Sequence, residues 1–155
     1  MLKIGKRSLF TFIKRLFEIE NYFAIIKFFR VHQKPFTAIF YEIFSLGNYP
    51  KLLYFNSPTG KAKVKIHSHH DFSTFNLIFC REDYFYRKKH KIVLDIGSNI
   101  GLSAIYWLTR NNDTIVYCYE PSSENFEKLK ENLEKFEGRF FIYKNAISSE
   151  SFSSY

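Results

Sequence analysis

The stretch Val93-Leu-Asp-Ile-Gly-Ser-Asn-Ile-Gly101 predicts the fold of the second half of this 155-residue chain. An apolar run carries one carboxylate, Asp95, and is followed by a turn with two glycines. Gly97 would let the backbone turn sharply and come close to a ligand, and Gly101 would let the next helix pack tightly on the strand. The pattern predicts a strand, a turn and a helix whose first amide groups face a bound molecule.

The residues that follow continue this alternation of strands and helices. We expect strands over residues 92–96, 114–119 and 139–143, with helices over residues 102–109 and 122–136 between them. Strands and helices that alternate at this spacing form parallel β-α-β units. The predicted fold class is therefore α/β, with a Rossmann-like parallel sheet.

Upstream of this core, residues 1–50 are expected to form a helical extension. Residues 8–23 place apolar side chains at helical spacing, and Asn21 is positioned to cap a second short helix. Pro35 and Gly47 would begin and end a third helix, because proline favours the first helical turn and glycine the residue after the last.

The positive charge of the chain is concentrated at its start. The formal net charge is +8 and the pI is near 9.4, but residues 1–34 alone carry +6. A helical cap over the sheet or substrate cleft is favoured there over a helix lying on a membrane surface. Because the rest of the chain carries little net charge, no nucleic-acid partner is expected. No signal peptide or apolar span is visible, so a cytoplasmic location is the default expectation.

Residues 51–90 are expected to form a β-hairpin and a helix that lead into a core of residues 91–155. The turn Ser57-Pro-Thr-Gly60 separates two strand-like runs. The second run alternates three apolar residues with three lysines, which predicts one buried and one solvated face. Asp71 is expected to cap the following helix.

Two residue groups resemble metal or redox sites, but a structural role is favoured for both. The run His67-Ser-His-His-Asp71 lacks a cysteine or a further carboxylate at metal-binding spacing, so linker or solvent-facing histidines are expected. Cys80 and Cys118 are far apart in sequence and form no C-x-x-C motif, so both are expected to be reduced packing residues. No metal is predicted.

The spacing of acid and glycine favours one class of cofactor. Glu120 ends the second strand, about 20 residues after Gly101, where an acid can accept hydrogen bonds from a ribose. The glycine pattern is D-x-G-x-x-x-G rather than G-x-G-x-x-G, with the bulkier Ser98-Asn99-Ile100 between the glycines, and no P-loop motif occurs. S-adenosylmethionine fits these features better than a dinucleotide, although a tight turn without a ligand is an alternative.

The chain resembles the FkbM-type family of S-adenosylmethionine-dependent methyltransferases. The resemblance covers residues 62–150 and rests on five motifs in order: Asp71-Phe-Ser-Thr-Phe-Asn-Leu-Ile-Phe79 with Tyr84, Val93–Gly101, Tyr119-Glu-Pro121, Glu131-Asn-Leu133 and Lys144-Asn-Ala-Ile-Ser148. It implies that Asp95 and Gly97 lie beside the methionine part of the cofactor and that Glu120 binds the ribose hydroxyls. It also places Asn145 and Ala146 near the adenine. The expected cofactor-binding set is completed by Ser98, Asn99, Gly101 and Pro121.

The resemblance further implies a seven-stranded sheet of order 3-2-1-4-5-7-6, of which this sequence supplies the first three strands. The chain is therefore expected to be truncated, with activity in doubt. The strand over residues 92–96 would lack a neighbour on one side, and its free edge could lead to self-association.

The activity implied is O-methylation of a sugar or of a secondary-metabolite hydroxyl, on a small-molecule or glycan acceptor. No catalytic residue is assigned. The alternatives are a non-catalytic remnant or assembly module, and a nucleic-acid methyltransferase that binds phosphates through residues 1–34.

Overall fold

The computed structural model of the chain divides into two compact units. Unit 1 is Met1–Phe85 and unit 2 is Tyr86–Tyr155. The structure describes residues 3–4, 7–8, 19–44, 48–82, 84 and 91–147. The predicted boundary after residue 50 falls within unit 1, and the one after residue 90 falls near the start of unit 2.

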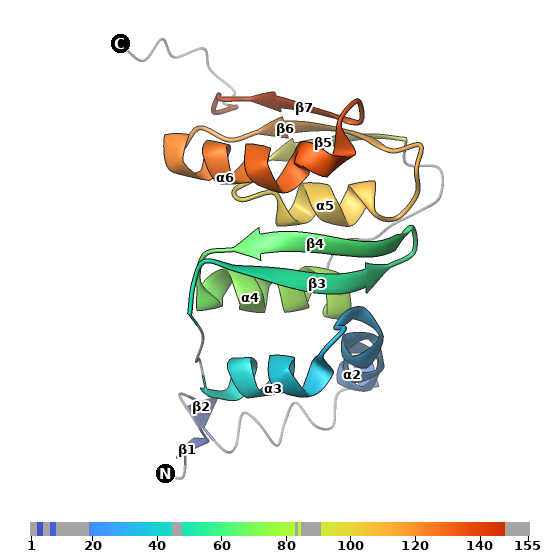
Figure 1. Ribbon diagram of the computed structural model, residues 1–155, viewed down its shortest axis with the longest axis vertical. Helices are drawn as coiled ribbons and strands as arrows, with labels where there is room; N and C mark the ends of the chain where they lie inside the picture. The colour runs from blue at the N-terminus through green and yellow to red at the C-terminus, as the bar shows by residue number, and fades with distance from the viewer. Residues whose placement is uncertain are drawn as a thin grey trace. The chain divides into compact units, whose positions relative to one another are not determined.

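Unit 1 combines helices with a β-hairpin (Figure 1). Its elements are the paired short strands β1 (Lys3–Ile4) and β2 (Arg7–Ser8), the helices α2 (Ile19–Val31) and α3 (Pro35–Phe44), the hairpin strands β3 (Lys51–Ser57) and β4 (Gly60–Ile66), and helix α4 (His69–Asn76), which continues as a π-helical turn, η1 (Leu77–Arg81).

The helices of unit 1 agree in part with the sequence-based predictions. Pro35 begins α3, as predicted. The predicted cap at Asn21 is wrong, because α2 runs through this residue without a break. The apolar residues that follow Asn21 suit a continuous helix, so no cap is needed there. Gly47 and most of the predicted helix over residues 8–23 lie outside the described residues.

The hairpin has the predicted two faces. Ala62, Val64 and Ile66 are all buried on its inner face. Phe55 of β3 contacts this core from the partner strand, and its ring centroid lies 5.1 Å from that of Phe75 on α4. Aromatic packing between the hairpin and α4 therefore forms the core of unit 1.

Helix α4 begins earlier than predicted, and its cap is Ser68 rather than Asp71. Ser68 has extended backbone angles (φ −153°, ψ 166°), and its Oγ accepts a hydrogen bond from the Asp71 N–H at 3.1 Å. The Asp71 carboxylate instead accepts from the His67 N–H at 2.8 Å. The helix therefore starts at His69, which places His69 and His70 in its first turn rather than beyond the strand.

Within the described residues, no three His, Cys, Asp or Glu side chains are grouped so as to hold a metal ion.

A buried polar network joins three helical segments of unit 1. His32, just after α2, is 3% exposed, and its Nε2 lies 2.7 Å from the Asn76 Oδ1 on α4. The Asn76 Nδ2 in turn donates to a carboxylate oxygen of Glu42 on α3 at 3.1 Å. Burial lowers the pKa of His32, so the neutral imidazole is favoured. Sequence patterns gave no sign of this network, because its members are far apart in the chain.

Unit 2 is the predicted α/β core. Its three strands are all parallel, in the order β5-β6-β7, and each helix connects one strand to the next. The elements are β5 (Ile92–Ile96), α5 (Leu102–Leu108), β6 (Ile115–Tyr119), α6 (Ser123–Leu133) with the 3₁₀ turn η2 (Glu134–Phe136), and β7 (Phe140–Tyr143). Ser122 caps α6.

Helices α5 and α6 lie on the same side of the sheet (Figure 1). Val116 and Cys118 of β6 are fully buried, as are Leu129 and Leu133 of α6.

Burial also raises the pKa of the Cys118 thiol to about 12, which keeps it protonated and unreactive. The prediction that both cysteines are free, buried packing residues is confirmed.

The opposite face of the sheet is apolar and exposed. Ile92, Leu94 and Ile96 of β5 are 67%, 64% and 61% exposed. In the strand register Leu94 lies beside Tyr117, and Tyr117 lies beside Phe141, which is also exposed. Parallel sheets are normally covered on both faces, whereas residues 91–147 place a helical layer on one face of this sheet only.

None of the helices described is both long and apolar enough to cross a bilayer.

Candidate functional site

The loop between β5 and α5 is held in a left-handed conformation at three residues. Gly97, Asn99 and Gly101 have φ values of 77°, 50° and 91°. The N–H groups of Gly97 and Ser98 both donate to the Tyr119 carbonyl, at 2.9 and 3.1 Å. The loop is thus fixed to the carboxyl end of the neighbouring strand, β6.

The two glycines of the loop serve different purposes. A Cβ at Gly101 would lie 2.9 Å from the Leu129 Cδ1, so this glycine lets the loop pack against α6. The sequence pattern predicted that Gly101 lets the following helix pack closely on the strand. The close neighbour of Gly101 is instead α6. A Cβ at Gly97 would meet nothing within 4 Å, so the backbone at Gly97 is open to an approaching molecule.

Asn132 also anchors the loop to α6. Its Nδ2 donates to the Ile100 carbonyl at 2.8 Å, and the side chain is buried. Asn132 belongs to the Asn-Leu pair that contributed to the family resemblance. The structure shows that this pair supports the loop from behind, with Leu133 near Gly101.

Asp95 lies at the end of β5 and points toward α5. One of its carboxylate oxygens accepts a hydrogen bond from the Ser103 Oγ at 2.7 Å. The Ser98 Oγ donates to the Asp95 carbonyl at 2.8 Å, which closes the turn after the strand. Burial raises the pKa of Asp95, and hydrogen bonds from Ser103 and Ser98 oppose this effect.

Glu120 connects the loop to the start of α6. It is only 5% exposed, and each carboxylate oxygen accepts one backbone hydrogen bond. The donors are the N–H groups of Asn99 at 2.8 Å and Ser122 at 2.9 Å. The Glu120 N–H itself donates to the Tyr143 carbonyl at 3.1 Å, which ties the end of β6 to β7. Each oxygen still has a lone pair for a further donor.

Most of the predicted cofactor residues meet at one place. Parallel strands have their carboxyl ends at one edge of a sheet, and the loop, Asp95 and Glu120 all lie at this edge. Pro121 follows Glu120 and is exposed, and Asn145 and Ala146 follow β7 and are also exposed. The residues that the hydrogen bonds above bring together are Asp95, Gly97, Ser98, Asn99, Gly101 and Glu120.

Sequence reasoning missed the residues that hold these groups in place. Ser103 was not singled out, although the first helical turn after such a loop lies beside the strand end. Ser122 was placed only at the start of a predicted helix, whereas its N–H binds Glu120. In both cases the partner is a residue whose position depends on how the strand, loop and helix pack.

Two cavities in the described residues lie away from this loop. One, of about 310 Å³, is lined by unit 1 residues of α3, β3 and the segment before α3. The other is an open hollow of about 480 Å³ beside α6, lined mainly by glutamates. At the loop itself, Glu120 is buried, whereas Gly97 and Asn99 are exposed.

The fold and this loop define a Rossmann-like α/β domain. No known family profile matches the chain, and no curated protein matches it. Three similar solved structures come from Pyrococcus horikoshii. The first is a proposed transferase, with a TM-score of 0.44 and 16% identity over 67% of this chain. The second is TYW2 in complex with MeSAdo, with a TM-score of 0.41 and 17% identity over 65% of this chain. The third is a proposed RNA methyltransferase, with a TM-score of 0.34 and 24% identity over 52% of this chain. The chain covers 38% of the length of each.

We predict that Glu120→Gln destabilises unit 2. A glutamine offers one acceptor oxygen, so one of the two backbone N–H groups would lose its partner. We expect a loss of about 1–3 kcal/mol in the free energy of unfolding. Urea unfolding followed by the fluorescence of Trp107, the chain's one tryptophan, would measure it in unit 2. Glu127→Gln, on the exposed side of α6, is the matched control, and equal losses in both variants would contradict the prediction.

We also predict a pH dependence that originates at Asp95. Because the pKa of this carboxyl is raised in the folded state, its protonated form stabilises unit 2. This contribution is complete below the unfolded pKa, about 3.9, and is lost as pH rises through the folded pKa. Urea unfolding from pH 3.5 upward should show wild type losing stability relative to Asp95→Asn. A difference that is constant with pH would contradict this assignment.

Proposed function

We propose that this chain is the cofactor-binding part of an S-adenosylmethionine-dependent methyltransferase of the FkbM type. The observation that carries the proposal is the arrangement at the ends of β5 and β6. Two carboxylates, Asp95 and Glu120, flank a left-handed loop whose backbone is open at Gly97. Acids at these two positions suit a molecule with a ribose at one end and a positive charge at the other.

The charge of the site favours S-adenosylmethionine over a dinucleotide. The loop over residues 97–101 has no lysine or arginine to neutralise a pyrophosphate, and both nearby ionisable side chains are acids. The cofactor would instead bring a sulfonium and an ammonium group. A cation beside Asp95 favours the ionised form of this buried carboxyl, which its surroundings otherwise disfavour.

Glu120 would hold the ribose. Its oxygens already accept hydrogen bonds from Asn99 and Ser122, and each has one lone pair left for a ribose hydroxyl. Because the carboxylate is nearly buried, the hydroxyls would reach it from the open side of the loop. Binding of the ribose and fixing of the loop therefore involve the same carboxylate.

The reaction we propose is methyl transfer to a hydroxyl oxygen of a sugar or a secondary metabolite. The bound cofactor supplies an activated methyl group. The residues of this chain would orient it, since holding donor and acceptor in line provides much of the rate enhancement. The acceptor is proposed from the FkbM resemblance alone, and the described residues include no assigned general base.

Calorimetric titration of the full chain with S-adenosylmethionine and S-adenosylhomocysteine tests the proposal. We expect both to bind, with Glu127→Gln binding as wild type does. Asp95→Asn should weaken the binding of S-adenosylmethionine more than that of S-adenosylhomocysteine, which lacks the sulfonium charge, by about two- to fivefold, as for a partly exposed ion pair. NAD⁺ should give no heat. A folded chain that gives no heat with either adenosyl compound would contradict the proposal and support a non-catalytic remnant.

A second candidate function is an assembly module, which the exposed sheet face favours. Among the described strands, β5 is hydrogen-bonded only to β6, so its other edge is open. An antiparallel contact of two β5 strands centred on Leu94 would place Ile92 of one copy beside Ile96 of the other. Such a two-fold contact is self-complementary and joins only apolar residues on the exposed face of the sheet, while Val93 and Asp95 lie opposite each other on the other face.

For this candidate we predict concentration-dependent self-association that Leu94→Lys abolishes. A lysine at the centre of the contact would place two like charges close together. Sedimentation velocity over a range of concentrations would measure the effect. Leu77→Lys, at an exposed leucine of unit 1, is the control and should associate as wild type does. A wild-type chain that is monomeric at every concentration would exclude self-association.

A further inference from the structure

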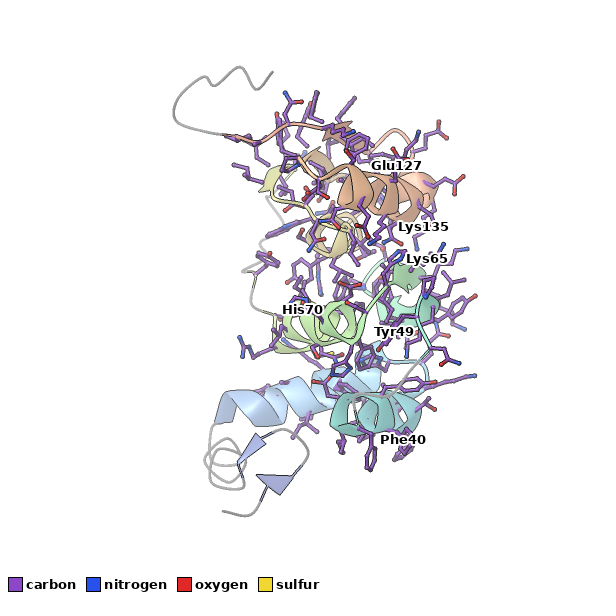
Figure 2. The ribbon with its side chains drawn as sticks, turned by 90° about the vertical axis from the view of Figure 1, so that its left-hand side faces the viewer. Phe40, Tyr49, Lys65, His70, Glu127 and Lys135 are labelled. Atoms are coloured by element: carbon purple, nitrogen blue, oxygen red, sulfur yellow. The ribbon has the colours of Figure 1, made fainter. Side chains whose placement is uncertain are left out.

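The outer face of the hairpin carries a row of lysines. Lys61, Lys63 and Lys65 alternate along β4 with the buried residues of the inner face, so they project from the outer one. Lys61 and Lys63 are exposed and Lys65 is half-buried. Alternate residues on a strand are about 6.6 Å apart. In Figure 2, Lys65 lies on the opposite side of unit 1 from His70 of α4. The row is thus a straight line of positive charge on an open face.

The neighbouring strand adds an aromatic ring and no negative charge. The register places Leu52, Tyr54 and Asn56 directly opposite the three lysines. Tyr54 is 52% exposed and lies beside Lys63. None of these six residues is acidic, so the face combines cations with an accessible ring.

A cavity of about 310 Å³ borders the same face. It lies between β3 and the segment before and within α3, and Leu52 and Tyr54 are among its lining residues. The polar groups that line it include Gln33, Lys34 and Thr37, and no carboxylate lines it. Its volume is in the range of small-ligand sites.

A further positive charge lies in the wall of this cavity. The Lys51 Nζ has no hydrogen-bond acceptor among the residues that the structure describes, and it is shielded from solvent. It lies 3.3 Å from the ring centroid of Tyr41. The ring stabilises the ammonium by a cation–π contact and leaves its charge uncompensated by any acid in the cavity wall. The cavity therefore favours an anionic or electron-rich occupant.

We propose that unit 1 binds single-stranded nucleic acid on this surface. The lysine row would contact successive phosphates, Tyr54 would stack on a base, and the cavity would accept an adjoining nucleotide. A lysine-lined track beside an aromatic ring is how proteins bind single strands without reading their sequence. A membrane surface fits less well, because Leu52 and Tyr54 are the only apolar residues on the face. The proposal does not depend on the proposed methyltransferase function.

This assignment differs from both expectations drawn from the sequence. Net charge outside residues 1–34 is small, which argued against a nucleic-acid partner. The alternative placed phosphate contacts within residues 1–34. The hairpin register instead gathers three lysines from residues 61–65 onto one face, with acids elsewhere in the chain balancing the total.

Fluorescence anisotropy of the full chain with a labelled 12-nucleotide oligouridylate tests the proposal. We expect binding that weakens with salt, with a slope of about −0.7 per phosphate contact in log–log form. Lys61→Gln/Lys63→Gln should reduce the steepness by about 1.4, because two contacts are lost. The control Lys91→Gln/Lys130→Gln removes the same charge at exposed positions of unit 2 and should leave the slope unchanged.

The role of Tyr54 is tested in the same assay. Tyr54→Ala should weaken binding by between about fivefold and a hundredfold, as loss of one stacked base does, whereas Tyr54→Phe should retain it. Absence of binding by wild type, or equal effects of the two double lysine variants, would overturn the proposal. Binding to phosphatidylserine vesicles or to heparin without binding to the oligonucleotide would overturn it in favour of a membrane or an acidic polysaccharide.

Discussion

The arrangement of unit 2 depends on one carboxylate and the two backbone amides that it binds. Glu120 accepts from Asn99 in the loop after β5 and from Ser122 at the start of α6, while its own N–H binds β7. A carboxylate can accept several hydrogen bonds at once, and charge-assisted bonds are stronger than those between neutral groups. The carboxylate therefore couples the loop to α6, and the backbone of the same residue adds the link to β7. An acid at this position therefore has a structural role whether or not a ligand is present.

The features predicted correctly from the sequence are those set by neighbours in the chain. The alternation of apolar and charged residues in β4 fixed both its faces, and the proline before α3 marked where this helix begins. The errors arose where two local signals competed. Asp71 and Ser68 are both good caps, and Ser68 prevails because a helix that starts at His69 also lets the Asp71 carboxylate bind the His67 N–H. At the site, the positions of Asp95 and Glu120 were predictable, but their partners were not, since Ser103 and Asn99 reach them only through tertiary packing.

The two faces of the sheet differ for a reason that the chain itself shows. Successive right-handed connections through α5 and α6 place both helices on one side, so residues 91–147 supply no helix to the other side. The exposed face is not polar, as it would be in a sheet that meets water on one side. Ile92, Leu94 and Ile96 have the composition of a buried strand. The sequence of unit 2 is thus consistent with a sheet that is covered on both faces, and this is the physical basis for proposing both a larger enzyme and an assembly contact.

In the function proposed for this site, loop rigidity and cofactor affinity would be linked. Asn99 has a positive φ that is uncommon for a residue other than glycine, and the hydrogen bond from its N–H to Glu120 helps to hold that conformation. A ribose that shares the Glu120 carboxylate would meet a loop already in place, so little conformational entropy would be lost on binding. A ribose that displaced the Asn99 N–H would instead release the loop and lose part of its binding free energy. The remaining lone pairs of Glu120 and the open backbone at Gly97 favour the first arrangement, in which the free chain is already organised for its ligand.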